Sequence, residues 1–398
     1  MTSDDQPSEA ARGPTFRFVA LMAFLISCVA LGIDLMLASL VQIGEELSPA
    51  APENATLVMG SFFMALGVAT FFVGPLLDAW GRRPVILGGL GLYALGGLMS
   101  WLAPSLTLML LGRALMGVGA AAPRVGVQAI IRDRYSGRQM AATISIVMMI
   151  FTLVPGVAPV MGAWIADAFG WRAVFFVFIL FGAGGAAWFA WQQPETLAKA
   201  QPLNFRIWVS EIRDAFRLPV FRQAMAIQLF TFASLYGFLT AGPAIFSQNY
   251  GIPGLYPYIF GAVSLLGAIA AFANSRLVKR LGMVVLSRAS LIVYTAINVV
   301  SLIAMASGAE LWSFVAPMFF GFFVLGFVIG NAQALALEPL GHIAGTASAT
   351  LVAAATLGAG LLAAPLPLMF GSQPMPFIAA TTAFGAIALW SAMRLAPD

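Results

Sequence analysis

Charged residues are scarce in this chain of 398 residues. Lys, Arg, Asp and Glu make up 9% of it and hydrophobic residues 61%, whereas about 25% of a soluble domain is charged. The single cysteine, Cys28, excludes an intramolecular disulfide, and the single histidine, His342, leaves no histidine cluster for a metal. A Gly-rich phosphate loop with lysine is also missing, which argues against ATP-driven transport, and no nucleophile–base pair appears. The composition predicts an integral membrane protein, and these absences lead us to expect that it is not an enzyme and needs no metal or cofactor.

Twelve apolar stretches of about 20 residues, the length that crosses a bilayer as a helix, are bounded by charges, proline or glycine. We therefore predict an all-α protein with twelve transmembrane helices. The first six are Phe18–Leu40, Ala55–Leu77, Val85–Leu102, Leu106–Ile131, Met140–Ile165 and Ala173–Trp191. The second six are Gln223–Ser247, Tyr256–Asn274, Val285–Ala306, Leu311–Leu335, Gly345–Leu368 and Pro376–Arg394.

The basic residues predict the orientation, since cytoplasmic loops hold an excess of Lys and Arg. With the N-terminus inside, 17 of the 20 basic residues fall on the cytoplasmic side, Arg172 falls outside, and Arg113 and Arg124 lie within a helix. We therefore expect both termini to be cytoplasmic. The net charge of +4 then reflects topology, and no nucleic-acid partner is expected.

A polar segment divides the chain into two six-helix halves. We expect an N-terminal half over residues 1–191, a cytoplasmic linker over 192–222 and a C-terminal half over 223–398. Apolar residues recur at helical spacing among arginines within the linker, which predicts an amphipathic helix on the inner membrane face. A passive linker is the alternative. Short charged turns ending in glycine, Leu76–Gly81 and Leu277–Gly282, follow the second span of each half and indicate parallel repeats.

Asp34 is the most informative residue, because it is a lone carboxylate within the first apolar stretch. A carboxylate there costs roughly 2.5–3.5 kcal/mol on insertion scales and usually serves ion or substrate handling. Asp34 and Arg113 both lie about 10 Å below the predicted outer boundary, at 1.5 Å per residue. We expect Asp34 to exchange a proton for substrate and Arg113 to modulate it. A static ion pair between two helices is the alternative.

Arg124 follows Arg113 by eleven residues and lies on the same helix face. Either it snorkels to the inner membrane surface, or it is a second charge in a central cavity and binds an anionic group. Aromatic and methionine side chains suit a cavity that adapts to varied apolar ligands. The other candidate lining residues are Phe62, Met64, Phe232, Tyr236, Asn331 and Gln333, although the last two, being two apart on one helix, cannot both face one cavity squarely.

A cytoplasmic loop carries the first resemblance to a known family. It reads Gly74-Pro75-Leu76-Leu77-Asp78-Ala79-Trp80-Gly81-Arg82-Arg83 and resembles the signature between helices two and three of the major facilitator superfamily. The resemblance implies a gating loop whose acid, Asp78, interacts with a helix end of the other half and with basic residues such as Arg82, and so latches the outward-facing state. Ala79 replaces the usual arginine of the signature, which implies a weaker latch. The residues in register are Gly74, Leu76, Asp78, Gly81, Arg82 and Arg83.

Two further segments resemble motifs of the same family. Leu111–Ala121 resembles the helix-four motif whose arginine, here Arg113, is tied to proton transfer. Pro155–Ala163 resembles the helix-five antiporter motif, in which Gly and Pro shape an interface that resists leak. Ala158 and Ala163 depart from its usual glycines. The residues that match the antiporter motif include Gly156, Pro159 and Gly162.

Three more segments narrow the resemblance to the twelve-helix drug:proton antiporters, in the branch of the bicyclomycin and chloramphenicol resistance exporters. They are Gly32–Leu37, Ile131–Gly137 and Ala344–Ala349. The first lacks the Tyr and Pro that are common in the branch, so the resemblance does not identify a substrate.

The resemblance implies a proton-coupled exporter of small amphiphilic drugs that works by alternating access. We expect it to be a monomer in the bacterial inner membrane, with lipid, protons and a small-molecule substrate as its partners. A proton-coupled transporter of one polar or anionic metabolite is the alternative. A receptor or assembly factor that transports nothing is a second class of alternative.

Overall fold

The computed structural model describes residues 14–200, 202–308 and 311–396, and every regular element in these ranges is helical. The N-terminal half contains α1 (Phe16–Asp34), α2 (Leu40–Leu47), α3 (Leu57–Trp80), α4 (Arg82–Trp101), α5 (Leu106–Arg134), α6 (Gly137–Phe169) and α7 (Trp171–Gln192). The linker contains α8 (Phe205–Arg217). The C-terminal half contains α9 (Pro219–Ala244), α10 (Tyr256–Leu281), α11 (Met283–Ala306), α12 (Leu311–Leu337), α13 (Ala344–Ala363), α14 (Pro365–Phe370) and α15 (Pro374–Met393).

The twelve-helix prediction is confirmed. Eleven apolar segments of the described chain are long enough to cross a membrane, and one of them, Leu311–Phe370, contains both α12 and α13. The prolines within the spans differ in their effect on the helices. The chain breaks at Ala364 before α14, and α9 passes into a π-helical turn after Pro243. The helix α6 continues through both of its prolines.

The first span differs from the continuous helix that the sequence predicts to Leu40. The helix α1 ends at Asp34, a 3-10 turn follows over Leu37–Ser39, and α2 begins at Leu40. The break lies where α6 crosses the chain, because the Cα of Gly162 faces the backbone carbonyl of Leu35 so closely that no side chain fits between them. Asp34 is therefore the last residue of a helix.

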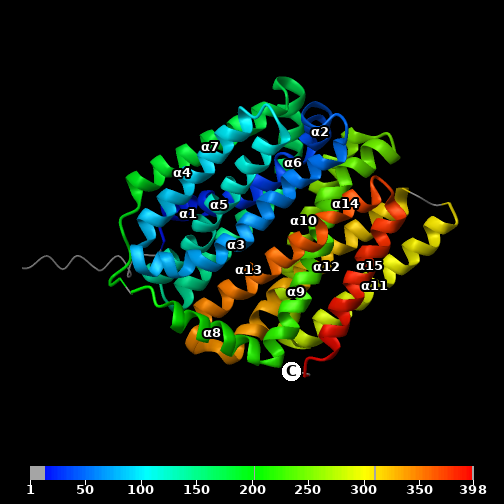
Figure 1. The fold of residues 1–398 in the computed structure, drawn as a ribbon. Helices are drawn as coiled ribbons and strands as arrows, with labels where there is room; N and C mark the ends of the chain where they lie inside the picture. Colours follow the sequence, from blue (N-terminus) through cyan, green and yellow to red (C-terminus); the bar gives the residue numbers. More distant parts are fainter. Residues whose placement is uncertain (1–13, 201, 309–310, 397–398) are drawn as a thin grey trace, which may run out of the picture.

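The two halves lie side by side, with α2 at one end of the bundle and α8 at the other (Figure 1). They meet where α3 packs on α13 and α6 packs on α10. Gly60, Gly67 and Gly74 follow one another at intervals of seven residues and so share a face of α3. A Cβ at Gly60 would lie 3.2 Å from Ala364, and one at Gly67 would lie 2.9 Å from the backbone of Leu357. A Cβ at Gly74 would meet no heavy atom within 4 Å, so α3 and α13 separate toward the end that carries α8.

The two halves repeat a backbone feature after their second span. Gly81 ends α3 with φ of 99° and ψ of 155°, and Gly282 ends α10 with φ of 82° and ψ of 161°. A positive φ is readily adopted only by glycine, so both turns need this residue. The repeat that the sequence indicates in these loops thus extends to their backbone conformation.

The linker helix α8 contacts both halves. Its Trp208 ring lies 5.6 Å from the Phe72 ring on α3, and its Glu211 accepts a hydrogen bond from Thr346 Oγ1 on α13 at 2.5 Å. Phe205, Ile207 and other apolar side chains remain exposed on its surface. The helix is therefore amphipathic and lies against both halves at one end of the bundle (Figure 1).

Candidate functional site

Asp34 is enclosed between the two halves. It is 4% exposed, and it forms no hydrogen bond or ion pair with the residues that the structure describes. Tyr236 on α9 and Tyr256 on α10 lie within electrostatic range of its carboxylate. A buried carboxylate without a partner is costly, so Asp34 is a group whose environment favours binding a proton or a ligand.

Arg113 lies next to the same stretch of α1 but is not ion-paired with Asp34. Its Nη2 donates to the carbonyl of Gly32 at 2.6 Å, and its guanidinium lies 4.6 Å from the centre of the Phe62 ring. The side chain is fully buried, and no carboxylate of the described chain pairs with it. The similar depth predicted for the two residues agrees with this geometry, whereas the static ion pair between them is absent from the structure.

A stack of three rings crosses from one half to the other beside Asp34. Tyr236 stacks on Phe63 of α3 at 3.8 Å between centroids and 7° between planes, and Phe232 stacks on Tyr236 at 5.7 Å and 5°. Arg124 on α5 lies within electrostatic range of Tyr236 and is half-buried. Arg124 is thus close enough to the C-terminal half for its charge to act on Tyr236.

The other candidate lining residues have different surroundings. Phe62 is fully buried under Arg113, and Met64 lies at the contact between α3 and α13, near Gly360. Asn331 is 3% exposed and exchanges two amide hydrogen bonds with Asn274 on α10, at 3.0 and 3.1 Å. Gln333 donates to Ser348 at 3.1 Å. Both amides are therefore engaged within the C-terminal half.

The glycines of Pro155–Ala163, the segment of α6 that resembles the antiporter motif, lie in close contacts with other parts of the chain. Gly162 lies against the backbone just after Asp34, and Gly156 lies against Leu265 and Gly261 of α10 in the other half. The buried Pro159 lies between them on a continuous helix. This segment of α6 therefore forms part of the contact between halves and also supports the end of α1.

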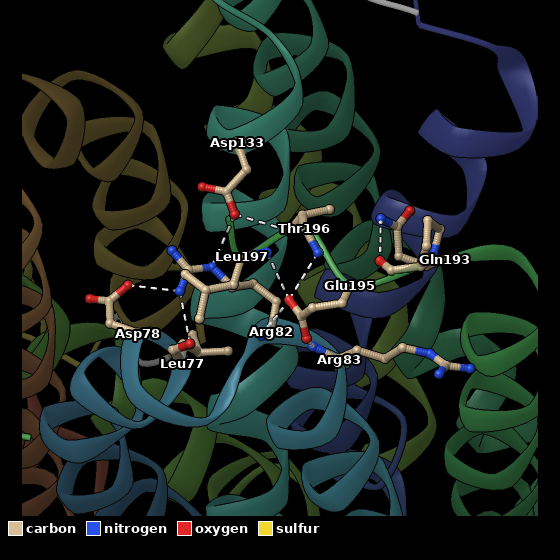
Figure 2. Close-up of polar contacts among 10 residues, drawn as sticks. Leu77, Asp78, Arg82, Arg83, Asp133, Gln193, Glu195, Thr196 and Leu197 are labelled. Carbon is tan, nitrogen blue, oxygen red and sulfur yellow. Dashed lines mark hydrogen bonds and ion pairs between the residues drawn. The ribbon is translucent and has the colours of Figure 1, made fainter. Parts of the chain in front are cut away.

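Charged groups of the gating loop form a network within the N-terminal half (Figure 2). The buried guanidinium of Arg82 contacts Asp78 at 2.8 Å and Asp133, at the end of α5, at 3.0 Å. Its Nη1 also donates to the carbonyl of Leu77 at 2.8 Å. Asp78 is half exposed and has no partner among the described residues of the C-terminal half. The latch that the resemblance implies between halves is thus not formed here.

Glu195, from the chain after α7, caps the first turn of α4. Its carboxylate accepts hydrogen bonds from the backbone N–H of Arg82 and Arg83, at 3.0 and 2.9 Å. It also accepts from the backbone N–H of Thr196 and Leu197, both at 2.9 Å. A carboxylate is favoured at a helix N-terminus, where unpaired N–H groups and the helix dipole are positive. Glu195 thereby fixes the start of the linker to the gating loop (Figure 2).

Partial burial raises the pKa of Glu195, but the four N–H donors outweigh it and hold the pKa below its ordinary value. A carboxylate with a depressed pKa stabilises the folded state above its unfolded pKa and loses this contribution as the pH falls toward the folded pKa. We therefore expect Glu195→Gln to lower the thermal unfolding midpoint at neutral pH. The difference from the unmodified protein should shrink below about pH 4.3, the ordinary pKa of glutamate.

The unfolding midpoint of detergent-purified protein, measured from neutral to acidic pH, checks this expectation. Glu53→Gln is the matched control, because Glu53 is exposed and its carboxylate accepts no hydrogen bond from the described chain. A constant difference between Glu195→Gln and the unmodified protein at every pH would contradict the assigned role.

Several residues of this site are missing from the candidates that sequence reasoning selects. Phe63 and Tyr256 are two of many aromatic residues in apolar helices, and nothing in their spacing distinguishes them. Asp133 belongs to a segment that carries the family resemblance, but its pairing with Arg82 is visible only in three dimensions. The Pro-Glu-Thr run around Glu195, at the end of a span, is a signal that could have found the cap.

Comparisons with known proteins agree with this architecture. The family model described as Major Facilitator Superfamily matches residues 22–393. A bicyclomycin resistance protein homolog of Haemophilus influenzae is 29% identical over 347 residues, covering 85% of each chain. A chloramphenicol resistance protein of Pseudomonas aeruginosa is 29% identical over 342 residues, covering 80% of this chain and 76% of its own. Multidrug resistance protein D of Escherichia coli is 27% identical over 308 residues, covering 77% of each chain.

Solved structures show the same fold. A D-xylose–proton symporter superposes with a TM-score of 0.76 at 15% identity, covering 95% of this chain and 97% of its own. A human organic anion transporter superposes with a TM-score of 0.68 at 17% identity, covering 98% of this chain and 99% of its own. These likenesses establish the arrangement of helices, and the family match establishes the relationship. The chain belongs to the major facilitator superfamily of membrane transporters.

Proposed function

We propose that this protein is a proton-coupled exporter of small amphiphilic compounds. The observation that carries the proposal is Asp34, a carboxylate enclosed between the two halves without a hydrogen bond or ion pair in the described chain. Such a buried carboxylate is stabilised by a proton when the site is empty and by a polar ligand when the site is filled. The names of the three drug-resistance relatives support drugs as substrates.

Competition between proton and substrate couples the two flows. A proton that enters from the more acidic outer side neutralises Asp34, and substrate that binds from the cytoplasm displaces it. Arg113 donates a hydrogen bond to the carbonyl of Gly32, two residues before Asp34. Its positive charge favours release of the proton from Asp34. Inward proton flow thereby drives outward substrate flow.

Rocking of the two halves would expose Asp34 to each side in turn. We assign the halves to residues 1–191 and 223–398, joined by the linker over 192–222. The gating loop of Gly74, Asp78, Gly81, Arg82 and Arg83 would close the end that carries α8. Gly156, Pro159 and Gly162 would keep the α6 contact tight against leak. The bacterial relatives support a place in the inner membrane, where we expect a monomer with both termini in the cytoplasm.

Transport by purified protein in liposomes tests this function. Acid-loaded liposomes, diluted into neutral buffer, should accumulate chloramphenicol as luminal protons leave in exchange. An uncoupler that collapses the pH gradient should abolish accumulation, and liposomes without protein provide the background. Uptake that is equally fast without a gradient would contradict proton coupling, and the absence of uptake for every drug and metabolite tested would contradict the exporter itself.

A further inference from the structure

Three charged side chains of the described chain lie at least seven residues from either end of the apolar segments Phe16–Leu47 and Leu106–Arg134. They are Asp34, Arg113 and Arg124, and all belong to the N-terminal half. Together they carry two positive charges and one negative charge, a net charge of +1. Protonation of Asp34 raises the net charge to +2. The centre of the protein is therefore positive in both protonation states, which disfavours a lipophilic cation and favours a group of negative charge.

Arg124 is the cation of this set that is open to a ligand. Arg113 is fully buried and bonded to Gly32, whereas Arg124 is half-buried and makes no hydrogen bond or ion pair with the described chain. It lies about 15 Å from the inner end of α5, at 1.5 Å per residue. An arginine at this depth with all five donors unused is rare unless a ligand or water completes its bonding.

The surroundings of Arg124 fit an aromatic body attached to an anionic group. Tyr236 lies within electrostatic range of both Arg124 and Asp34. Its stack with Phe63 and Phe232 places three buried aromatic rings at the contact between the halves. Thr356 is fully buried, and its hydroxyl lies beside the Tyr236 phenol. The site thus brings a guanidinium, aromatic rings and two hydroxyl groups together.

We propose that Arg124 is the anion subsite of the substrate site, and that the preferred substrates are aromatic or apolar compounds that bear a carboxylate or a similar anionic group. The inference rests on the proposed export function and specifies its substrate class. A planar guanidinium binds a carboxylate through two parallel hydrogen bonds. Tyr236, which lies within electrostatic range of both Arg124 and Asp34, then lies against the body of the compound.

Three probes with one naphthalene body and different charges test the subsite. They are naphthaleneacetate, its neutral amide and naphthylmethyl trimethylammonium, and their binding to full-length protein in lipid nanodiscs is measured by calorimetry. We expect the unmodified protein to bind naphthaleneacetate about tenfold more tightly than the amide, and the ammonium least well. Arg124→Gln should weaken naphthaleneacetate about 10- to 100-fold and leave the amide nearly unchanged.

Arg132→Gln is the matched control, because it removes one positive charge from an exposed position at the inner end of the same helix. It should bind all three probes as the unmodified protein does. Full binding of naphthaleneacetate by Arg124→Gln would overturn the proposal. So would a preference of the unmodified protein for the ammonium, or its failure to bind any probe. The comparison of probes on the unmodified protein needs no variant, so misfolding of Arg124→Gln leaves the test intact.

The outcome is separable from that of the export experiment. Probe binding at equilibrium requires no pH gradient, so a carboxylate preference remains measurable even if gradient-driven accumulation of chloramphenicol fails. If chloramphenicol accumulates but the probes show no carboxylate preference, the anion subsite is wrong and the exporter stands.

Discussion

Asp34→Asn is expected to abolish proton release on substrate binding and to reduce gradient-driven transport to the background of empty liposomes. Asparagine is nearly isosteric with aspartate but cannot exchange a proton at any accessible pH. Because Asp34 has no hydrogen bond or ion pair in the described chain, the substitution breaks no contact and removes a buried charge. The variant should therefore fold and should still bind substrate.

Proton release is measured with a pH indicator in weakly buffered detergent solution, and transport with acid-loaded liposomes. Asp167→Asn, an exposed aspartate near the end of α6, is the matched control and should behave as the unmodified protein does. If Asp34→Asn still releases protons when substrate binds, the coupling carboxylate lies elsewhere and the assignment of Asp34 is wrong.

Gly162→Ala should be the most damaging single-methyl change in the protein. The added Cβ would overlap the backbone carbonyl of Leu35. Neither group can rotate away, because a Cβ is fixed by its own backbone and the carbonyl is itself part of the backbone. Overpacking of this kind costs about 1–3 kcal/mol and sometimes more. Relief would require α6 to move away from the chain segment that begins at Asp34. We expect a lower unfolding midpoint together with impaired coupling.

Thermal unfolding and gradient-driven transport of the same preparation measure the two effects. Gly184→Ala on α7 adds the same methyl group where no heavy atom lies within 4 Å, and it should leave both quantities unchanged. Equal unfolding midpoints for Gly162→Ala and Gly184→Ala would show that the contact at Leu35 is not tight in solution.

The helices were predictable because their signal is repeated over some twenty residues. A bilayer requires long apolar stretches with satisfied backbone groups, and the charged loops between them set the boundaries to within a few residues. The end of α1 at Asp34 was not predictable, because the apolar stretch continues to Leu40 and the break arises from the approach of Gly162 on another helix.

The site was predictable in part for a related reason. Charges inside apolar helices are rare, so Asp34, Arg113 and Arg124 are visible in the sequence alone. Their partners are not visible. Arg113 donates to Gly32 rather than pairing with Asp34, and Arg124 lies within electrostatic range of Tyr236. Both pairings depend on how the helices are rotated and on contacts between the halves. Residue spacing along one helix does not determine either.

The row of glycines on α3 also has a mechanical meaning. Gly67 touches the backbone of Leu357, while Gly74, two turns further along the same face, touches nothing. The contact at Gly67 can serve as a fulcrum, with the length of helix to Asp78 as a lever arm of about 16 Å. A rigid rotation of about 10° about this point would carry Asp78 by about 3 Å. Because the fulcrum has no side chain of its own, little packing has to be remade as the lever turns.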